Sequence, residues 1–255
     1  METKELFSLE SRTALVTGAG NGLGVEYARV LAECGARVIV TDIDESGVDR
    51  TVAELADRGL DVVGRRVDVS DPASVEACSA QFSDVDILIN NAAMFATVPM
   101  SRAGYAELDV DEWDRMMAVN LRGIWLMARS FVPGMQQRGY GKVVNISSGT
   151  ALKGSSGRIH YVTTKAGVIG FTKTLAREVG DDGVLVNCLA PGSTLSEKEQ
   201  TDDVMRLRSA AANNRILKRV QQPADLLGAL IFLSAPASDF MTGQTVVVDG
   251  GSALH

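Results

Sequence analysis

Seven short runs rich in β-branched residues recur along this 255-residue chain, separated by segments long enough for a helix. The runs show little alternation of polar and apolar residues, which is typical of strands buried on both faces. Parallel strands need a long crossover connection, usually a helix. The pattern therefore predicts a parallel α/β sheet, with strands at residues 14–16, 38–40, 62–63, 87–89, 143–144, 184–186 and 246–248.

The segments between these runs carry the predicted helices, at residues 21–34, 45–58, 72–82, 111–138, 158–179 and 223–234. No linker rich in proline, serine or charge divides them, so residues 1–255 are interpreted as one domain. In open parallel sheets, ligands bind at the carboxyl ends of the strands. We therefore expect the loops at residues 92–110, 149–160 and 193–219 to meet a substrate, the last of them as a lid.

Charge and cysteine content argue against several classes of protein. The 25 lysines and arginines against 32 aspartates and glutamates give a net charge of −7, which repels nucleic-acid phosphates and anionic lipid heads. The three cysteines form no CxxC pair, so neither a disulfide framework nor a metal site is expected. The chain starts without an apolar signal core, and no run reaches about 18 apolar residues. These features predict a cytoplasmic protein with no nucleic-acid or membrane partner.

A glycine-rich turn follows the first predicted strand and precedes a helix. It contains Gly18, Gly22 and Gly24, with Asn21 and Leu23 among them. Glycines at such a turn let the backbone approach a pyrophosphate and aim the helix N-terminus at its charge. The spacing differs from the standard GxGxxG, so the turn alone is a weak signal of dinucleotide binding.

Asp42 ends the second predicted strand, 18 residues after Gly24. An acid at this place accepts hydrogen bonds from the adenosine ribose and repels a 2′-phosphate. Neither Asn21 nor Ile43 is a base that could hold such a phosphate. These residues predict NAD as the cofactor. A solvated turn acid is the alternative interpretation of Asp42.

Tyr161 and Lys165 are four residues apart on a predicted helix and therefore share one face. A nearby cation stabilises a phenolate, which makes a tyrosine a usable general base. Ser148, thirteen residues before Tyr161 at the end of a strand, could reach the same reacting oxygen. No GxSxG surrounds Ser147 or Ser148, so acyl transfer is not expected. His160 is expected at the rim of the pocket or on the surface.

Over essentially its whole length, the chain resembles the single-domain branch of the short-chain dehydrogenase/reductase family. Eight segments match the motifs of that family in the same order along the chain. They are residues 17–24, 68–69, 90–93, 120, 145–148, 161–165, 191–192 and 248–251. The resemblance implies a single doubly wound Rossmann-type domain, with a seven-stranded parallel sheet flanked by helices on both faces.

The resemblance also implies roles for individual residues. Asn120, Ser148, Tyr161 and Lys165 resemble the family's catalytic tetrad, in which the asparagine holds a water that passes a proton from the lysine to solvent. The implied cofactor-binding residues are Gly18, Asn21, Gly22, Leu23, Gly24, Asp42, Asp68, Val69, Asn91, Tyr161, Lys165, Pro191, Gly192 and Thr194.

Three departures from the family pattern bear on the substrate. Ala93 stands where the family usually has glycine, and Ser196 stands where it usually has threonine. Both replacements are small. The stretch between Asn91 and Trp113 is longer than usual, which leaves the substrate open but not the reaction class.

The predicted function is that of an NAD-dependent oxidoreductase, which transfers a hydride between a secondary alcohol or ketone and the nicotinamide, with Tyr161 as general acid and base. Two alternatives stay open: epimerase or dehydratase chemistry on the same scaffold, and a non-catalytic dinucleotide-sensing protein. A sensing protein has no physical need for a complete tetrad. An epimerase or dehydratase would reduce and reoxidise its cofactor within one cycle, so NADH would not accumulate with an alcohol substrate. The accumulation of NADH therefore distinguishes a dehydrogenase from the first alternative.

The substrate pocket is expected to be mostly aliphatic and to suit a neutral, apolar alcohol or ketone. Five cations argue against this prediction, because any of them could turn inward and bind an anion. For Arg206 and Arg208, acidic neighbours favour a solvated face of the lid instead. The cations are Arg102, Lys153, Arg158, Arg206 and Arg208. The expected wall residues are Met94, Phe95, Val98, Met100, Ala151, Leu152, Ile159, Leu195, Val204, Met205 and Leu207.

The helices predicted at residues 111–138 and 158–179 are apolar nearly all round, which indicates burial on two sides. One side can pack on the sheet, so the other needs a second chain or a loop of the same chain. The resemblance adds that family members commonly pair these two helices across a dimer axis and assemble as tetramers. We therefore expect a homotetramer.

Overall fold

The order of the strands places the first strand in the middle of the sheet. The computed structural model describes residues 2–95, 100–197 and 201–254. Its strands follow the order β3-β2-β1-β4-β5-β6-β7, and all neighbours are parallel. They are β1 (Thr13–Thr17), β2 (Arg37–Asp42), β3 (Val62–Arg66), β4 (Ile87–Asn90), β5 (Gly141–Ile146), β6 (Val184–Pro191) and β7 (Thr245–Val248). The chain reverses direction across the sheet between β1 and β4, where ligands bind in such folds.

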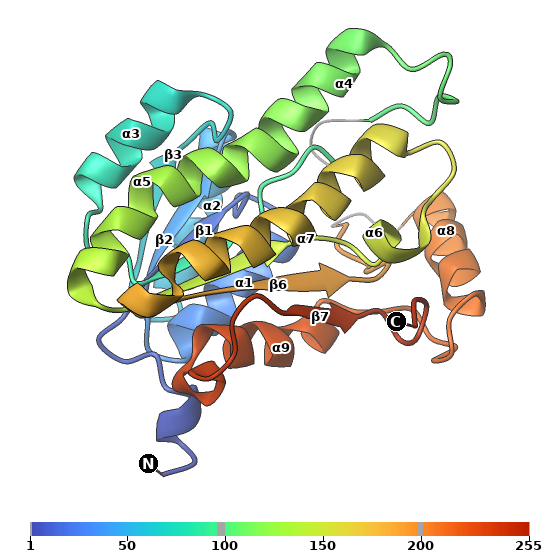
Figure 1. Ribbon diagram of the computed structural model, residues 1–255. Coiled ribbons are helices and arrows are strands. Elements are labelled where there is room, and N and C mark those ends of the chain that lie inside the picture. The colour runs from blue at the N-terminus through green and yellow to red at the C-terminus, as the bar shows by residue number, and fades with distance from the viewer. Residues whose placement is uncertain (1, 96–99, 198–200, 255) are drawn as a thin grey trace.

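Helices cover both faces of this sheet (Figure 1). They are α1 (Gly22–Glu33), α2 (Glu45–Ala56), α3 (Pro72–Gln81), α4 (Val110–Met117), α5 (Gly123–Arg138), α6 (Thr150–Lys153), α7 (Ile159–Val179), α8 (Asp202–Asn213) and α9 (Ala224–Ser234). One face packs against α1, α2 and α9, and the other against α3, α5 and α7. This arrangement confirms the predicted Rossmann-type fold. Across the described ranges, no helix is long and apolar enough to cross a membrane.

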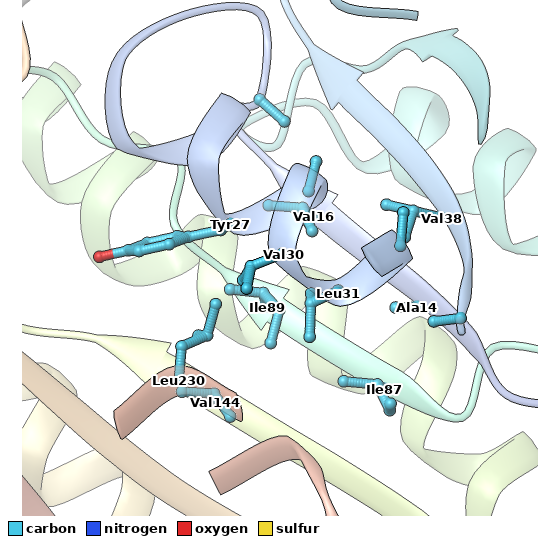
Figure 2. Packing of buried hydrophobic residues seen from close by; sticks show 14 of the residues in the cluster. Ala14, Val16, Tyr27, Val30, Leu31, Val38, Ile87, Ile89, Val144 and Leu230 are labelled. Carbon is cyan, nitrogen blue, oxygen red and sulfur yellow. The ribbon is translucent and has the colours of Figure 1, made fainter. Parts of the chain in front are cut away.

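Alternate side chains of β1 enter opposite cores. Ala14 and Val16 pack with α1 residues such as Tyr27, and with Leu230 of α9, in the cluster that Figure 2 shows from close by. Leu15 packs on the other face with residues of α3, α5 and α7. Burial of an aliphatic side chain of this size contributes roughly 1.5–3 kcal/mol. The two cores therefore fix the position of the carboxyl end of β1, where the glycine-rich turn begins.

The helix predicted at residues 111–138 is interrupted in the structure. A π-helical turn over Ala118–Arg122 separates α4 from α5. Such a turn shifts the phase of the residues that follow it, but the segment is apolar nearly all round, so the shift leaves no visible break in the sequence. π turns are frequent at functional sites. Asn120 lies in this turn and is completely buried. The other predicted helices begin and end within two residues of the observed bounds.

The prediction of an irregular stretch at residues 193–219 is wrong in part, because α8 lies inside it. Thr201 caps this helix: its hydroxyl accepts the backbone N–H of Val204 at 3.3 Å. Asp202 and Asp203 follow in the first turn, where acids complement the helix dipole. These signals were present in the sequence. Residues 96–99 and 198–200 of the predicted loops lie outside the described residues.

Candidate active site

A cavity of about 1010 Å³ opens at the carboxyl ends of the strands. With one exception, Asn120, every residue predicted to bind the cofactor or take part in catalysis lines it. Residues from the glycine-rich turn, from the ends of β2, β4, β5 and β6, and from α7 therefore meet in one place, although they are scattered along the sequence.

The glycine-rich turn is a tight cradle next to the end of β4. Gly18 and Gly22 have φ angles of 65° and 58°, in the left-handed region that favours glycine. A Cβ added to Gly18 would lie 2.8 Å from the Cα of Ala92. The side-chain amide of Asn91 donates to the carbonyl oxygens of Thr17 at 2.9 Å and Gly18 at 3.0 Å. The turn is thus held with the start of α1 against the cavity, and this cradle fits the pyrophosphate of a dinucleotide.

Asp42 lies at one end of the cavity and is buried, with 8% of its surface exposed. Its carboxylate accepts the backbone N–H of Gly20 at 2.9 Å and that of Asp44 at 3.0 Å. A Cβ on Gly20 would lie 3.1 Å from this carboxylate, so the residue must be small. The acid is therefore built into the turn and faces the cavity, not bulk solvent.

Asp68 and Val69 line the same end of the cavity beyond β3. The Asp68 carboxylate accepts the backbone N–H of Ser70 at 2.8 Å and its hydroxyl at 2.7 Å. Val69 packs against Gly123, where an added Cβ would lie 2.9 Å from the valine side chain. Val69 gives this end of the cavity an apolar side chain beside the Asp68 carboxylate, and such a pair could hold an adenine ring.

Tyr161 stands in the first turn of α7 with 7% of its surface exposed. Its ring centroid lies 5.3 Å from that of Phe95, and the ammonium nitrogen of Lys165 lies 5.8 Å from it. Burial raises the pKa of Tyr161, while a hydrogen bond to Ser148 and the charges of Arg158 and Arg208 lower it. Burial outweighs the other contributions, so the pKa of Tyr161 stays raised above its ordinary value, and the serine hydroxyl and the two cations offset part of that rise.

Lys165 is almost wholly buried one turn further along α7. Its ammonium donates to the carbonyl oxygen of Ile146 at 2.7 Å. Burial lowers the pKa of Lys165 to about 8. The side chain can therefore change its protonation state near physiological pH.

Asn120 approaches the site from outside the cavity. Its side-chain oxygen accepts the backbone N–H of Met94 at 2.8 Å, and its amide nitrogen lies 2.9 Å from the sulfur of Met116 and 3.4 Å from the hydroxyl of Thr164. The resemblance implied a water-holding role. The structure shows contacts with protein groups, and the contact with Met94 holds the loop that carries Phe95.

Pro191, Gly192 and Thr194 form the edge of the cavity after β6. A Cβ on Gly192 would lie 2.8 Å from the Cα of Asp249, so no side chain fits there. The Thr194 hydroxyl donates to the Gly192 carbonyl at 3.1 Å, which fixes the backbone of this turn toward the cavity.

The prediction of a mostly aliphatic substrate wall is wrong for several residues. Met94, Phe95, Met100, Val204 and Leu207 line the cavity, and Val98 lies outside the described residues. The wall does not include Ala151, Leu152, Ile159, Leu195 and Met205. Leu152 and Ile159 are exposed to solvent, and Leu195 is buried in the protein.

Four of the five cations named from the sequence line the cavity beside the apolar residues. They are Arg102, Lys153, Arg158 and Arg208. Arg208 was expected on a solvated face, but it is only 9% exposed and turns inward to meet Ser193 at 2.9 Å and Glu197. His160 is neither at the rim nor on the surface: it is buried, with Nε2 3.1 Å from Glu112.

Comparisons with known proteins show the family of the chain. A family model described as enoyl-(acyl carrier protein) reductase matches residues 18–253. The 3-oxoacyl-(acyl-carrier-protein) reductase FabG of Vibrio cholerae is 36% identical over 250 residues, which cover 96% of this chain and 98% of that protein. Dehydrogenase/reductase SDR family member 4 of Bos taurus is 36% identical over 255 residues, covering 97% and 89% of the two chains.

A solved structure extends the likeness to three dimensions. The gluconate 5-dehydrogenase from Burkholderia cenocepacia, in complex with NADP and tartrate, superposes with a TM-score of 0.90 at 33% identity, covering 99% of this chain and 100% of the other. A glycine cradle, a buried tyrosine with its lysine, and relatives of matching length therefore agree. The chain belongs to the short-chain dehydrogenase/reductase family of oxidoreductases.

Proposed function

We propose that this protein is an NAD-dependent dehydrogenase or reductase that interconverts a secondary alcohol and its ketone. The observation that carries the proposal is the meeting of Tyr161, Ser148 and Lys165 in the cavity that also contains the glycine cradle. When bound, the nicotinamide ring supplies the hydride acceptor or donor. Gly18 to Gly24, Asp42, Asp68 and Thr194 are the groups that would hold the dinucleotide.

The side chains handle the proton. In alcohol oxidation the Tyr161 phenolate accepts the proton of the substrate hydroxyl, and in ketone reduction the phenol returns it. The Ser148 hydroxyl, itself held by the hydroxyl of Thr150 at 2.9 Å, orients the reacting oxygen. The charge of Lys165 stabilises the phenolate, and a pKa of about 8 lets the lysine pass protons onward.

The preference for NAD over NADP is supported by Asp42. Its carboxylate is fixed by two backbone N–H groups at the mouth of the glycine cradle, where a 2′-phosphate would meet a negative charge. The neighbouring bases are engaged with backbone oxygens: Arg50 donates to Gly20 at 3.1 Å and Arg66 to Ile43 at 3.2 Å. NADP is named with the Burkholderia structure, so the choice needs a direct test.

A spectrophotometric screen tests this function. The purified enzyme is mixed with NAD or NADP and with secondary alcohols of graded size and charge, and the reverse reaction is measured with the ketones. We expect reduced cofactor to accumulate in proportion to the ketone formed. Its absence with every alcohol, despite interconversion of a substrate, would favour epimerase or dehydratase chemistry.

We also infer self-association into a homotetramer. A groove of about 570 Å³ runs along α4, the π turn, α5 and α7, and its lining includes Met117, Leu121, Trp125 and Phe171. Trp125 is 47% exposed and adjoins the other apolar residues of the groove, and contiguous exposed apolar surface marks interaction sites. The helices of the groove are the two that the sequence predicts at the dimer axis.

The proposed organisation is a single domain over residues 1–255, with substrate loops at 92–110, 149–160 and 193–219. The loop residues that line the cavity, among them Phe95, Lys153 and Leu207, come from all three segments and support this assignment. The proposed location is the cytoplasm, where thiols such as the buried Cys78 and Cys188 stay reduced.

A further inference from the structure

We propose, on the basis of the function proposed above, that the substrate is a hydroxy acid or oxo acid whose carboxylate binds Arg158, with Arg102 as a second cation. The inference names the substrate class of the same site. It replaces the neutral, apolar substrate that the sequence favoured.

The Arg158 guanidinium group contacts the Phe95 ring but has no ion-pair partner among the described residues. It is half-buried at the start of α7, lines the cavity, and its central carbon lies 5.6 Å from the ring centroid of Phe95. Its Nε is buried and has no hydrogen-bond partner, and no carboxylate in the described part of the chain forms an ion pair with it. Buried donors are normally satisfied, and a planar carboxylate matches the two-pronged geometry of arginine.

The fold holds a second cation near Arg158 although like charges repel. A Cβ on Gly157 would lie 3.0 Å from the carbonyl oxygen of Arg102, so the two segments are in close contact. Glu112 joins them further: its carboxylate accepts the backbone N–H of Ser101 at 2.7 Å and lies 3.1 Å from His160. Burial, followed by the charge of Arg102, lowers the pKa of Arg158. An anion between the two guanidinium groups would remove this repulsion.

The acids at this end of the cavity are already engaged. Glu197 pairs with Arg208. The Asp249 carboxylate accepts three backbone N–H groups, those of residues 251 to 253, at 2.8–3.0 Å. In a protein with a net charge of −7, Arg102 and Arg158 line the cavity without a carboxylate at ion-pair distance in the described part of the chain. Such cations attract anions from solution.

Phe95 relates this anion site to the reacting group. Its ring lies 5.3 Å from that of Tyr161 and 5.6 Å from the Arg158 guanidinium. A ligand that spans Phe95 can therefore place a carboxylate on Arg158 and a hydroxyl on Tyr161, with its carbon chain along Met94 and Met100. The spacing favours a carboxylate a few bonds from the carbinol carbon.

Binding without turnover tests the anion site directly. Butanoate, hexanoate and octanoate are titrated calorimetrically into the full-length enzyme saturated with NADH, alongside the neutral amides of the same length. We expect at least one carboxylate to bind about tenfold or more tightly than its amide, the difference that a charge-assisted hydrogen bond provides. Arg158→Gln should abolish that difference, and Arg158→Lys should keep part of it.

Two further variants complete the comparison. Arg102→Gln should weaken carboxylate binding to a smaller degree and leaves the start of α7 intact, in case Arg158→Gln does not fold. Arg206→Gln is the matched control: this arginine of α8 pairs with Asp203 and its side chain is 77% exposed. It should bind carboxylates as the unmodified enzyme does.

A kinetic arm separates this inference from the proposed function. The hydroxy acids 3-hydroxybutanoate and 5-hydroxyhexanoate are compared with their methyl esters, and we expect kcat/KM to favour an acid, with the preference lost through KM in Arg158→Gln. Carboxylate binding that depends on Arg158, without turnover of any alcohol, would support the anion site and contradict the oxidoreductase function. Turnover of esters and acids alike, with no amide-to-carboxylate difference in any pair, would overturn the inference and leave the function standing.

Discussion

The side-chain oxygen of Asn120 accepts the backbone N–H of Met94 at 2.8 Å, which joins the π turn between α4 and α5 to the loop after β4. The residue after Met94 is Phe95, whose ring packs on Tyr161. A buried asparagine thus controls the wall of the active site without lining the cavity. It acts as a positioning residue in this structure.

Removal of this contact should loosen the wall. In Asn120→Ala the buried N–H of Met94 loses its acceptor, which costs roughly 1–3 kcal/mol. We expect a lower free energy of unfolding in urea, and a higher KM together with a lower kcat, because Phe95 is no longer held against Tyr161. Asn213→Ala, at the exposed end of α8, is the control and should change neither. A stability loss with unchanged KM would remove Asn120 from the positioning of the wall.

Tyr161 should be essential for chemistry but not for cofactor binding. Tyr161→Phe keeps the ring contact with Phe95 and removes only the hydroxyl. General acid–base catalysis contributes typically about 10²- to 10⁴-fold, so kcat should fall by at least the lower factor. The affinity for NADH, measured by fluorescence titration, should stay within a few-fold. Near-normal turnover would exclude Tyr161 as the proton carrier.

The buried charge of Lys165 should lower the free energy of unfolding of the protein at neutral pH. The pKa of Lys165 in the folded protein is about 8, below the ordinary 10.5, because burial disfavours the charged form. Between these values the unfolded chain binds the extra proton, so this lysine makes stability rise with pH through that window, and the penalty is present in full below pH 8. It amounts to roughly 3 kcal/mol at most.

The variant Lys165→Met should therefore be inactive and yet more stable at pH 7. Part of the gain is offset because the carbonyl of Ile146 loses its donor. Urea unfolding of both proteins at pH 7 and pH 9.5 measures the effect, and the advantage of the variant should shrink at the higher pH. An advantage that does not change with pH would mean that the lysine is not strained by burial.

The sequence predicted the parts of this protein that depend on chain-local chemistry. Buried β-branched runs, glycines in a tight turn and a Tyr–Lys pair four residues apart are local patterns, and the cavity brings them together as expected. The π turn could not be predicted, because the helix is apolar nearly all round and the phase shift at the turn leaves no visible break in the sequence pattern. The prediction of NAD rather than NADP rests on a single residue, Asp42.

The side chains at the substrate end of the cavity could not be predicted from the sequence, because long-range contacts position them. Glu112 and His160 are 48 residues apart, and their contact joins the start of α4 to the start of α7, which carries Arg158. Arg208 turns inward because Glu197 and Ser193 lie on the cavity side of α8, a relation that the phase of an unpredicted helix decides. Neither contact leaves a sequence pattern. The aliphatic wall was inferred from the residue types in the loops. Which side chains actually line the cavity depends on contacts between charged residues that are distant in the sequence.

Trp125 gives a test of assembly. Its exposed ring lies on α5 beside Leu121 and Phe171 of the groove described above. Trp125→Glu places a charge at the centre of the proposed interface, and a buried unpaired charge is strongly unfavourable. We expect light scattering to give a multiple of 27.1 kDa for the unmodified protein and a smaller species for the variant. A monomer in both cases at micromolar concentration contradicts the proposed tetramer.

The cofactor preference should depend on Asp42 and can be separated from its structural role. We expect NAD to be preferred over NADP by tenfold or more in kcat/KM, since NADP forfeits ribose hydrogen bonds worth roughly 1.5–3 kcal/mol each and places a phosphate against the carboxylate. Asp42→Asn keeps an oxygen for the N–H of Gly20 but removes the charge, so it should narrow the preference with little loss of stability. Asp44→Asn, which lies outside the cavity lining and holds Ser46, is the matched control and should keep the full preference. Equal use of both cofactors by the unmodified enzyme, or an unchanged ratio in Asp42→Asn, would show that this carboxylate does not select the cofactor.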